Sequence, residues 1–295
     1  QLRQVVEMLC ALPLEERRHV PGINPQRADI IICGAAIIET LMSEFGIAEL
    51  AISERGLRDG LLIDYLAKVE TSPGLQGLSV RARSVLQLGR ACGIDEPHAR
   101  HVSNLALELF DSAYEHGLHK FGDRERELLD YAALIHDVGT FLSYSNHHQH
   151  SYYLIRNADL LGFDQGEIEI LANAALFHRK SMPSKKKHAE FTALDRRSQR
   201  IVRLFALLLR IAESLDRSHT GVVHHAGLTA VDRDEAILTI EASQECDLEV
   251  WGVQSHREAF KKVFKRQMVV KTVIGGGEPT TPKLPLPDSA GIPES

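Results

Sequence analysis

The stretch Tyr131-Ala-Ala-Leu-Ile-His136-Asp137-Val-Gly139-Thr140 is an apolar run that ends in an adjacent histidine and aspartate and then a glycine. The run predicts a helix, and Gly139 is expected to close it in a left-handed conformation. Neighbouring residues on a helix point about 100° apart, so His136 and Asp137 can reach one ion only where the helix ends. Imidazole and carboxylate groups both bind divalent cations, and the pair is therefore a candidate metal site.

The composition narrows the class of protein. The chain has 295 residues, which suggests about two domains. It contains no apolar run long enough to span a membrane, and a formal net charge of -6 gives no support to nucleic-acid binding. The four cysteines are far apart and form no C-x-x-C pair, which favours a reducing cytoplasm over a disulfide framework. The chain begins without an initiator methionine or a signal-peptide pattern, so we expect it to start inside a longer protein.

Residues 1–68 read as a β-α-β-α piece. The segment Ala28–Cys33 predicts a buried strand, Gly34 a tight turn and residues 35–45 a helix. A second strand at 49–53 and a helix at 61–66 follow. A glycine at each strand-to-helix turn can present backbone N–H groups to an anion, as nucleotide-binding folds do, although a plain packing turn is the simpler interpretation.

Helical periodicity dominates from the linker at 69–79 to residue 221. Helices are predicted at 80–92, from Asp95-Glu96-Pro97 onward, and at 124–137, 147–160, 165–179 and about 198–216. Histidines and aspartates recur on the inner faces or at the ends of these helices: His101, His136, Asp137, His147, His150, His178 and Asp216. Each alone has an ordinary explanation as hydrogen-bonded packing or a solvated helix end. Together, a bundle with this many inward polar groups must pair them or bind a metal.

The pattern changes to a period of two after residue 222. Strands are predicted at 227–231, 236–242, 247–253 and 268–273, with one helix at 255–266. We therefore expect a small antiparallel α+β subdomain over residues 222–274. The Gly- and Pro-rich tail, 275–295, is expected to be disordered.

The order of the polar groups carries a first resemblance. His101, His136-Asp137 and Asp216, each on its own helix, resemble the H…HD…D signature of the HD-domain metal-dependent phosphohydrolases. The resemblance implies a helical bundle that holds a divalent cation, with Mg, Mn, Zn and Fe left open. His178 and either His147 or His150 lie where some members of that superfamily add ligands for a second metal. The helical period places both His147 and His150 inward, so the sequence does not choose between them.

Longer stretches resemble the exopolyphosphatases of the Ppx/GppA family. They are Leu14-Glu-Glu-Arg-Arg, Pro21-Gly22, Ala28-Asp-Ile-Ile-Ile-Cys-Gly34, Ser53-Glu-Arg-Gly-Leu-Arg58-Asp-Gly60, His147-His-Gln-His-Ser-Tyr-Tyr-Leu-Ile and Phe177-His-Arg-Lys. The resemblance implies that 1–68 is the C-terminal piece of an actin-like ATPase-type catalytic region and that 69–221 is an HD-like helical domain. Gly34, and less strongly Arg58, match phosphate-contacting positions, and the main catalytic acid would lie upstream of residue 1. The substrates implied are inorganic polyphosphate or guanosine pentaphosphate, in a cytoplasmic enzyme that we expect to be a homodimer.

Basic residues follow the predicted ligands: Arg179, Lys180, Lys185, Lys186, Lys187 and Arg217. They are candidates for contact with a polyanion, and for the three consecutive lysines a solvated loop is the simpler interpretation. Three functions remain open. The chain is the C-terminal part of an exopolyphosphatase, a self-sufficient HD phosphohydrolase acting on a nucleotide or phosphate ester, or a non-catalytic module for polyphosphate binding or dimerisation. The reading frame upstream of residue 1 distinguishes the first from the second.

Overall fold

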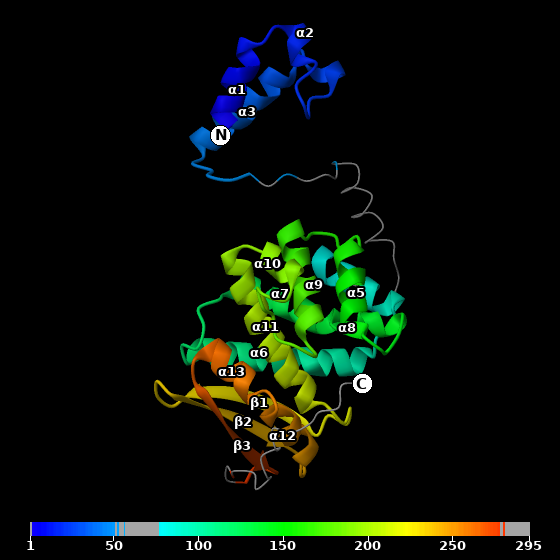
Figure 1. Cartoon of the computed structure of the whole chain (residues 1–295), viewed down its shortest axis with the longest axis vertical. Helices are drawn as coiled ribbons and strands as arrows, with labels where there is room; N and C mark the ends of the chain where they lie inside the picture. The colour runs from blue at the N-terminus through cyan, green and yellow to red at the C-terminus, as the bar shows by residue number, and fades with distance from the viewer. Residues whose placement is uncertain (1, 51, 53–55, 57–76, 278–279, 281–295) are drawn as a thin grey trace. The chain divides into compact units, whose positions relative to one another are not determined.

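The computed structural model describes residues 2–50, 52, 56, 77–277 and 280, and the chain divides into two compact units, 1–70 and 71–295 (Figure 1). The first unit is helical in its described part. Helix α1 (Leu2–Ala11) packs against α3 (Ile31–Glu44), and the short α2 (Leu14–Arg17) and the 3₁₀ turn η1 (Pro25–Arg27) connect them.

The strand predicted at Ala28–Cys33 is wrong. This segment is a turn followed by the start of α3, and Gly34 lies inside that helix, where its N–H donates to the Ile30 carbonyl at 3.2 Å. That N–H is therefore not free for a phosphate. A helix satisfies its backbone groups internally, whereas a strand needs a paired neighbour, and a short apolar run does not by itself distinguish the two. Residues 49 and 50 are not in a strand, while Arg58 and the helix predicted at 61–66 lie outside the described residues.

The second unit contains the helices expected from the sequence, within a few residues at their ends. They are α5 (Val80–Ala91), α6 (Glu96–Glu115), α7 (Asp123–Ile135), α8 (His147–Asn157), α9 (Gln165–Phe177) and α11 (Arg196–Leu215). The short helix α10 (Ala189–Ala193) and the 3₁₀ turn η2 (Val138–Phe141) after α7 were not predicted. Helix α11 is central: it packs against α6 and α9 and buries Ile201, Leu204 and Leu208. Asp95, Asp164 and Asp195 begin α6, α9 and α11, because each carboxylate accepts a hydrogen bond from a backbone N–H in the first turn.

A three-stranded sheet packs beside these helices (Figure 1). Strand β1 (Val223–Ala230) pairs antiparallel with β2 (Glu235–Ala242), and β2 pairs parallel with β3 (Gln267–Ile274). Helix α6 covers the edge of β1: Ala226 N–H donates to the Glu108 carboxylate at 3.0 Å and Leu228 N–H donates to Ser112 Oγ at 2.9 Å. The edge strand is thus kept from pairing elsewhere.

The purely antiparallel sheet predicted for this region is wrong, because residues 247–253 form a helix, α12 (Asp247–Gln254), rather than a strand. Val250 and Val253, three residues apart, are buried, while Leu248 and Trp251 are exposed, which is a helical pattern. A parallel β2–β3 pair requires a crossover connection, and α12 with α13 (Arg257–Phe264) provides it. The tail predicted to be disordered lies almost entirely outside the described residues. Among the helices that the structure describes, none has the length and apolar character of a membrane span.

Candidate metal centre

Six potential metal ligands lie at the ends of five helices of the second unit. His98 is in the first turn of α6, where its backbone N–H donates to the Asp95 side chain at 3.2 Å. His136 and Asp137 follow α7, His147 opens α8, His178 follows α9, and Glu213 is in the last turn of α11. At helix ends the backbone changes direction, so side chains from separate helices can converge on one point.

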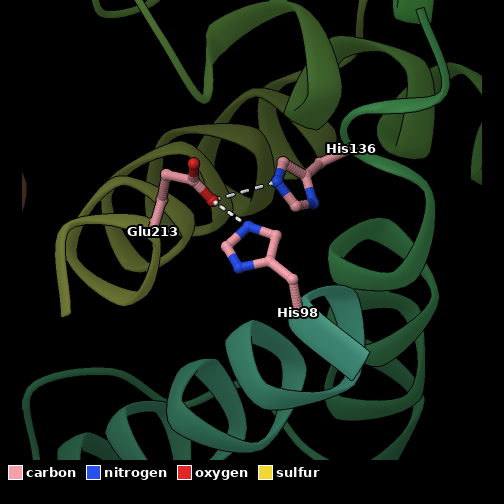
Figure 2. Close-up of side chains that lie close together, drawn as sticks. All are labelled: His98, His136 and Glu213. Atoms are coloured by element: carbon pink, nitrogen blue, oxygen red, sulfur yellow. Dashed lines mark hydrogen bonds and ion pairs between the residues drawn. The ribbon is translucent and has the colours of Figure 1, made fainter. Parts of the chain in front are cut away.

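The first cluster joins His98, His136 and Glu213 (Figure 2). Glu213 Oε2 lies 3.2 Å from His98 Nε2 and 3.1 Å from His136 Nε2, and both rings point toward this one oxygen. The other ring nitrogen of His98, Nδ1, lies 2.7 Å from Asp216 Oδ2. Asp216 is fixed in turn by the Gly221 N–H, which donates to its Oδ1 at 3.0 Å. Asp216 therefore orients a candidate ligand.

The second cluster surrounds Asp137. Its Oδ1 lies 3.2 Å from His147 Nε2, 3.2 Å from His178 Nε2 and 3.9 Å from His136 Nε2. His147 Nε2 and His178 Nε2 are only 3.3 Å apart. Asp137 Oδ1 is buried and accepts no hydrogen bond from the residues that the structure describes. His136 belongs to both clusters, which places all six side chains in one continuous candidate metal centre.

The backbone determines which ring nitrogen carries the proton. Nδ1 of His136, His147 and His178 faces the carbonyl oxygen of the residue three positions earlier, at 2.6, 2.9 and 2.6 Å. A carbonyl can only accept, so Nδ1 is the donor and Nε2 of the neutral ring keeps its lone pair. Two such lone pairs at 3.3 Å need a positive charge between them, either a proton or a cation. The donor set of imidazole nitrogens and carboxylate oxygens, without thiolate, fits a divalent metal ion.

The pKa values reflect this close pairing of opposite charges. Burial by itself lowers the pKa of His136, but Asp137 and Glu213 raise it to about 9. Burial likewise opposes protonation of His98, while hydrogen bonds to Asp216 and Glu213 raise its pKa to about 10. Burial alone would raise the pKa of Asp137 and Glu213, yet the facing histidines hold both well below their ordinary values. Without a metal, protons on the histidines hold the first cluster together.

Gly139 serves close packing rather than the left-handed helix closure expected from the sequence. It lies in η2, and it is not among the glycines with positive φ. A Cβ atom there would lie 2.1 Å from the His147 carbonyl oxygen and 2.3 Å from the Ser151 backbone nitrogen. Its N–H also donates to Ser151 Oγ at 2.9 Å. The absence of a side chain thus allows α8 to approach η2 and brings His147 to Asp137.

The predicted ligands are distributed unequally in the structure. His136, Asp137 and His178 lie together, and His147 rather than His150 reaches Asp137. His101, His150 and Asp216 belong to neither ligand cluster that the described residues form. The sequence did not predict His98 and Glu213 as ligands. Each lies three residues before a predicted ligand, His98 before His101 and Glu213 before Asp216, and is therefore on nearly the same helical face. That spacing is the sequence feature that indicates them.

The predicted phosphate-binding cations differ in position. Arg179 lies against Tyr144, with Nη1 3.4 Å from the phenol oxygen. Burial lowers the pKa of His148 to about 4, and the positive charges of His178, His147, Lys180 and Arg179 add to this. Burial also lowers the pKa of the candidate ligand His147, and the charge of Arg179 contributes to that shift. Arg217 places its guanidinium 5.2 Å from the Trp251 ring centroid. Lys185, Lys186 and Lys187 are exposed in the loop before α10.

Comparison with known proteins gives the family. The family model described as Ppx/GppA phosphatase, domain III, matches residues 80–255, and that of the Ppx/GppA phosphatase family matches residues 1–69. The chain therefore belongs to the Ppx/GppA phosphatase family, as its sequence predicted. It is 26% identical over 163 residues to a guanosine-5'-triphosphate,3'-diphosphate pyrophosphatase of Pseudoalteromonas translucida (strain TAC 125). That match covers 55% of this chain and 31% of the relative, so the chain spans about a third of the relative's length.

Proposed function

We propose that this chain takes part in the hydrolysis of terminal phosphoanhydride bonds, in inorganic polyphosphate or guanosine pentaphosphate, and that its helical unit binds a divalent cation at the candidate metal centre. One observation carries the proposal: Nε2 of His147 and of His178 meet at Asp137 Oδ1, each 3.2 Å away. Membership of the Ppx/GppA family supports the reaction class. The printed name of the Pseudoalteromonas relative supports a nucleotide polyphosphate as one substrate.

In this proposal some residues of the second unit bind the cation and others bind the phosphate. A divalent cation bound here would supply Lewis-acid activation of water and would neutralise phosphoryl charge. Its ligands would be His136, Asp137 and His178, with His98, Glu213 and His147 completing the centre. Asp216 would orient His98. Arg179 and Lys180, which directly follow His178, would be the cations that contact phosphoryl oxygens. Imidazole-rich donors favour Mn, Fe or Zn over Mg.

A second candidate function is a self-sufficient HD-type phosphohydrolase acting on a nucleotide or phosphate ester. The observation that favours it is that every candidate ligand, from His98 to Glu213, belongs to the second unit. Hydrolysis by that unit would then need nothing from residues 1–70. The non-catalytic module, the homodimer and the cytoplasmic location stay predictions.

Metal content tests the proposal directly. Protein purified without a chelator should contain close to stoichiometric divalent metal by mass spectrometry, and Asp137→Ala and His178→Ala variants should lose most of it. His224→Ala, which removes an exposed histidine on β1, is the matched control and should keep the wild-type content. Equal metal in the wild type and the Asp137→Ala variant would overturn the assignment. Phosphate release from guanosine pentaphosphate and from polyphosphate by an Asp137→Asn variant then separates a catalytic centre, where release falls, from a purely binding one.

A further inference from the structure

An apolar loop borders the candidate metal centre. Residues 142–146 join η2 to α8, so the loop lies between Asp137 and His147 in the chain. Phe141, the last residue of η2, is 62% exposed, and in the loop Leu142 is 52% and Tyr144 is 72% exposed. Three exposed large apolar side chains thus fall within four residues of the chain, and exposed apolar patches commonly mark a ligand site.

Tyr144 contacts the ring of His147, whose Nε2 is a candidate ligand atom. Its carbonyl oxygen accepts from His147 Nδ1 at 2.9 Å, and its ring centroid is 5.4 Å from that of His147. Arg179, which directly follows His178, places its guanidinium carbon 5.6 Å from the Tyr144 ring centroid. An exposed aromatic face, a cation and the candidate metal ligands are thus neighbours.

We propose that Tyr144, with Arg179 beside it, is a nucleobase platform, so that the ligand of this centre is a nucleoside polyphosphate rather than inorganic polyphosphate. This inference rests on the proposed function and names its substrate class. Inorganic polyphosphate is charged along its whole length and has no apolar face that could cover Tyr144. A nucleotide combines phosphates, for the metal centre and Arg179, with a flat base that stacks on an aromatic ring. Stacking uses the face of the ring, so the platform accepts either purine.

Two triphosphates that differ only in the nucleoside isolate the platform. GTP and inorganic tripolyphosphate are titrated into the full chain with Mn²⁺ by calorimetry. The platform predicts that GTP binds more tightly by roughly tenfold, the order expected for one stacked base. Tripolyphosphate carries the greater negative charge, so electrostatic attraction alone would favour it instead. Tighter binding of GTP than of tripolyphosphate would therefore show that the base contributes to the affinity.

Variants of Tyr144 complete the test. Tyr144→Ala should reduce the ratio of the two affinities to near one, and Tyr144→Phe, which keeps the aromatic face, should retain the preference for GTP. Tyr153→Ala is the matched control, since Tyr153 is a 63% exposed tyrosine on α8, and it should leave both affinities unchanged. Equal wild-type affinities for the two ligands, or an equal loss of both in Tyr144→Ala, overturn the platform while the phosphate site stands. Failure of both ligands to bind the wild type overturns the platform and the proposed phosphate site together.

Discussion

The rings of the four histidines at the candidate centre are oriented in two different ways. His136, His147 and His178 each donate Nδ1–H to a carbonyl three residues earlier, a contact that the end of a helix supplies without any side chain. His98 has no such carbonyl partner and depends on the Asp216 carboxylate instead. The local backbone therefore orients the first three rings, while a residue 118 positions along the chain orients the fourth.

The raised pKa of His136 predicts how the metal-free chain responds to pH. The folded state holds a proton on His136 up to about pH 9, whereas the unfolded chain loses it near 6.5. This contribution, on the order of 3 kcal/mol, is fully present below pH 6.5 and disappears as the pH rises to about 9. Thermal melts in chelator should therefore show lower stability at pH 9 than at pH 6. The lowered pKa values of Asp137 and Glu213 act only in acid, outside this range.

The same melts on two variants identify the group responsible. His98, whose pKa is raised to about 10, contributes to the fall in stability in the same direction. A His136→Gln variant should therefore lose part of the fall in stability between pH 6 and pH 9. A His224→Gln variant, altered at an exposed residue, should keep the wild-type behaviour. An unchanged pH dependence in His136→Gln would mean that another group holds the proton.

Among the elements, the contact between η2 and α8 assembles the second cluster. Ser151 Oγ accepts from Gly139 N–H, and the backbone of α8 passes so close to Gly139 that no side chain fits between them. This contact sets the separation between Asp137, just before η2, and His147, at the start of α8. The position of a ligand is thus decided by a residue that is not itself a ligand.

Substituting Gly139 tests this contact. Gly139→Ala places a methyl group against the His147 carbonyl, and because that neighbour is backbone it cannot move aside cheaply. We expect a loss of about 1–3 kcal/mol in the free energy of unfolding, measured by denaturant titration, and a weaker hold on metal. Gly227→Ala on β1 is the control, because its added Cβ would meet Ser112 at an ordinary 3.9 Å. Equal stability of the two variants would show that α8 moves freely.

For the whole molecule, binding of a polyanion must overcome a formal net charge of -6. Local cations therefore have to dominate the field at the centre. Arg179 and Lys180 are the candidates, since they directly follow His178 and the charge of Arg179 acts on His147. The role predicted from sequence for Lys185, Lys186 and Lys187 stays a prediction.

Salt dependence separates these two groups of cations. An Arg179→Ala/Lys180→Ala double variant should bind tripolyphosphate several-fold more weakly and with a shallower dependence on salt, because screening acts on the charges that remain. The Lys185/Lys186/Lys187→Ala triple variant removes more charge, and a loss as large as that of the double variant would establish the lysines as contacts. Affinities unchanged from the wild type would identify them as a solvated loop. Melting temperatures of all variants check that folding is intact.

The sequence by itself determined the long helices between residues 80 and 216 and three of the six candidate ligands, His136, Asp137 and His178. It could do so because helix caps, the apolar period of 3.6 and the position of a side chain at a helix end are local properties. It also limited another ligand to His147 or His150. The family followed from the resemblance of whole stretches of the chain.

Only the tertiary structure decided which side of each helix faces the centre. Residues three apart lie on nearly the same helical face, so His98 and His101, or Glu213 and Asp216, look equivalent until the neighbouring helices are placed. The tertiary structure also decided the secondary structure of Ala28–Cys33 and residues 247–253. Both segments are apolar enough for a strand, but the first forms a turn and the start of a helix and the second forms a helix. A strand depends on hydrogen bonds to a partner elsewhere in the chain, and that partner is a property of the fold rather than of the segment.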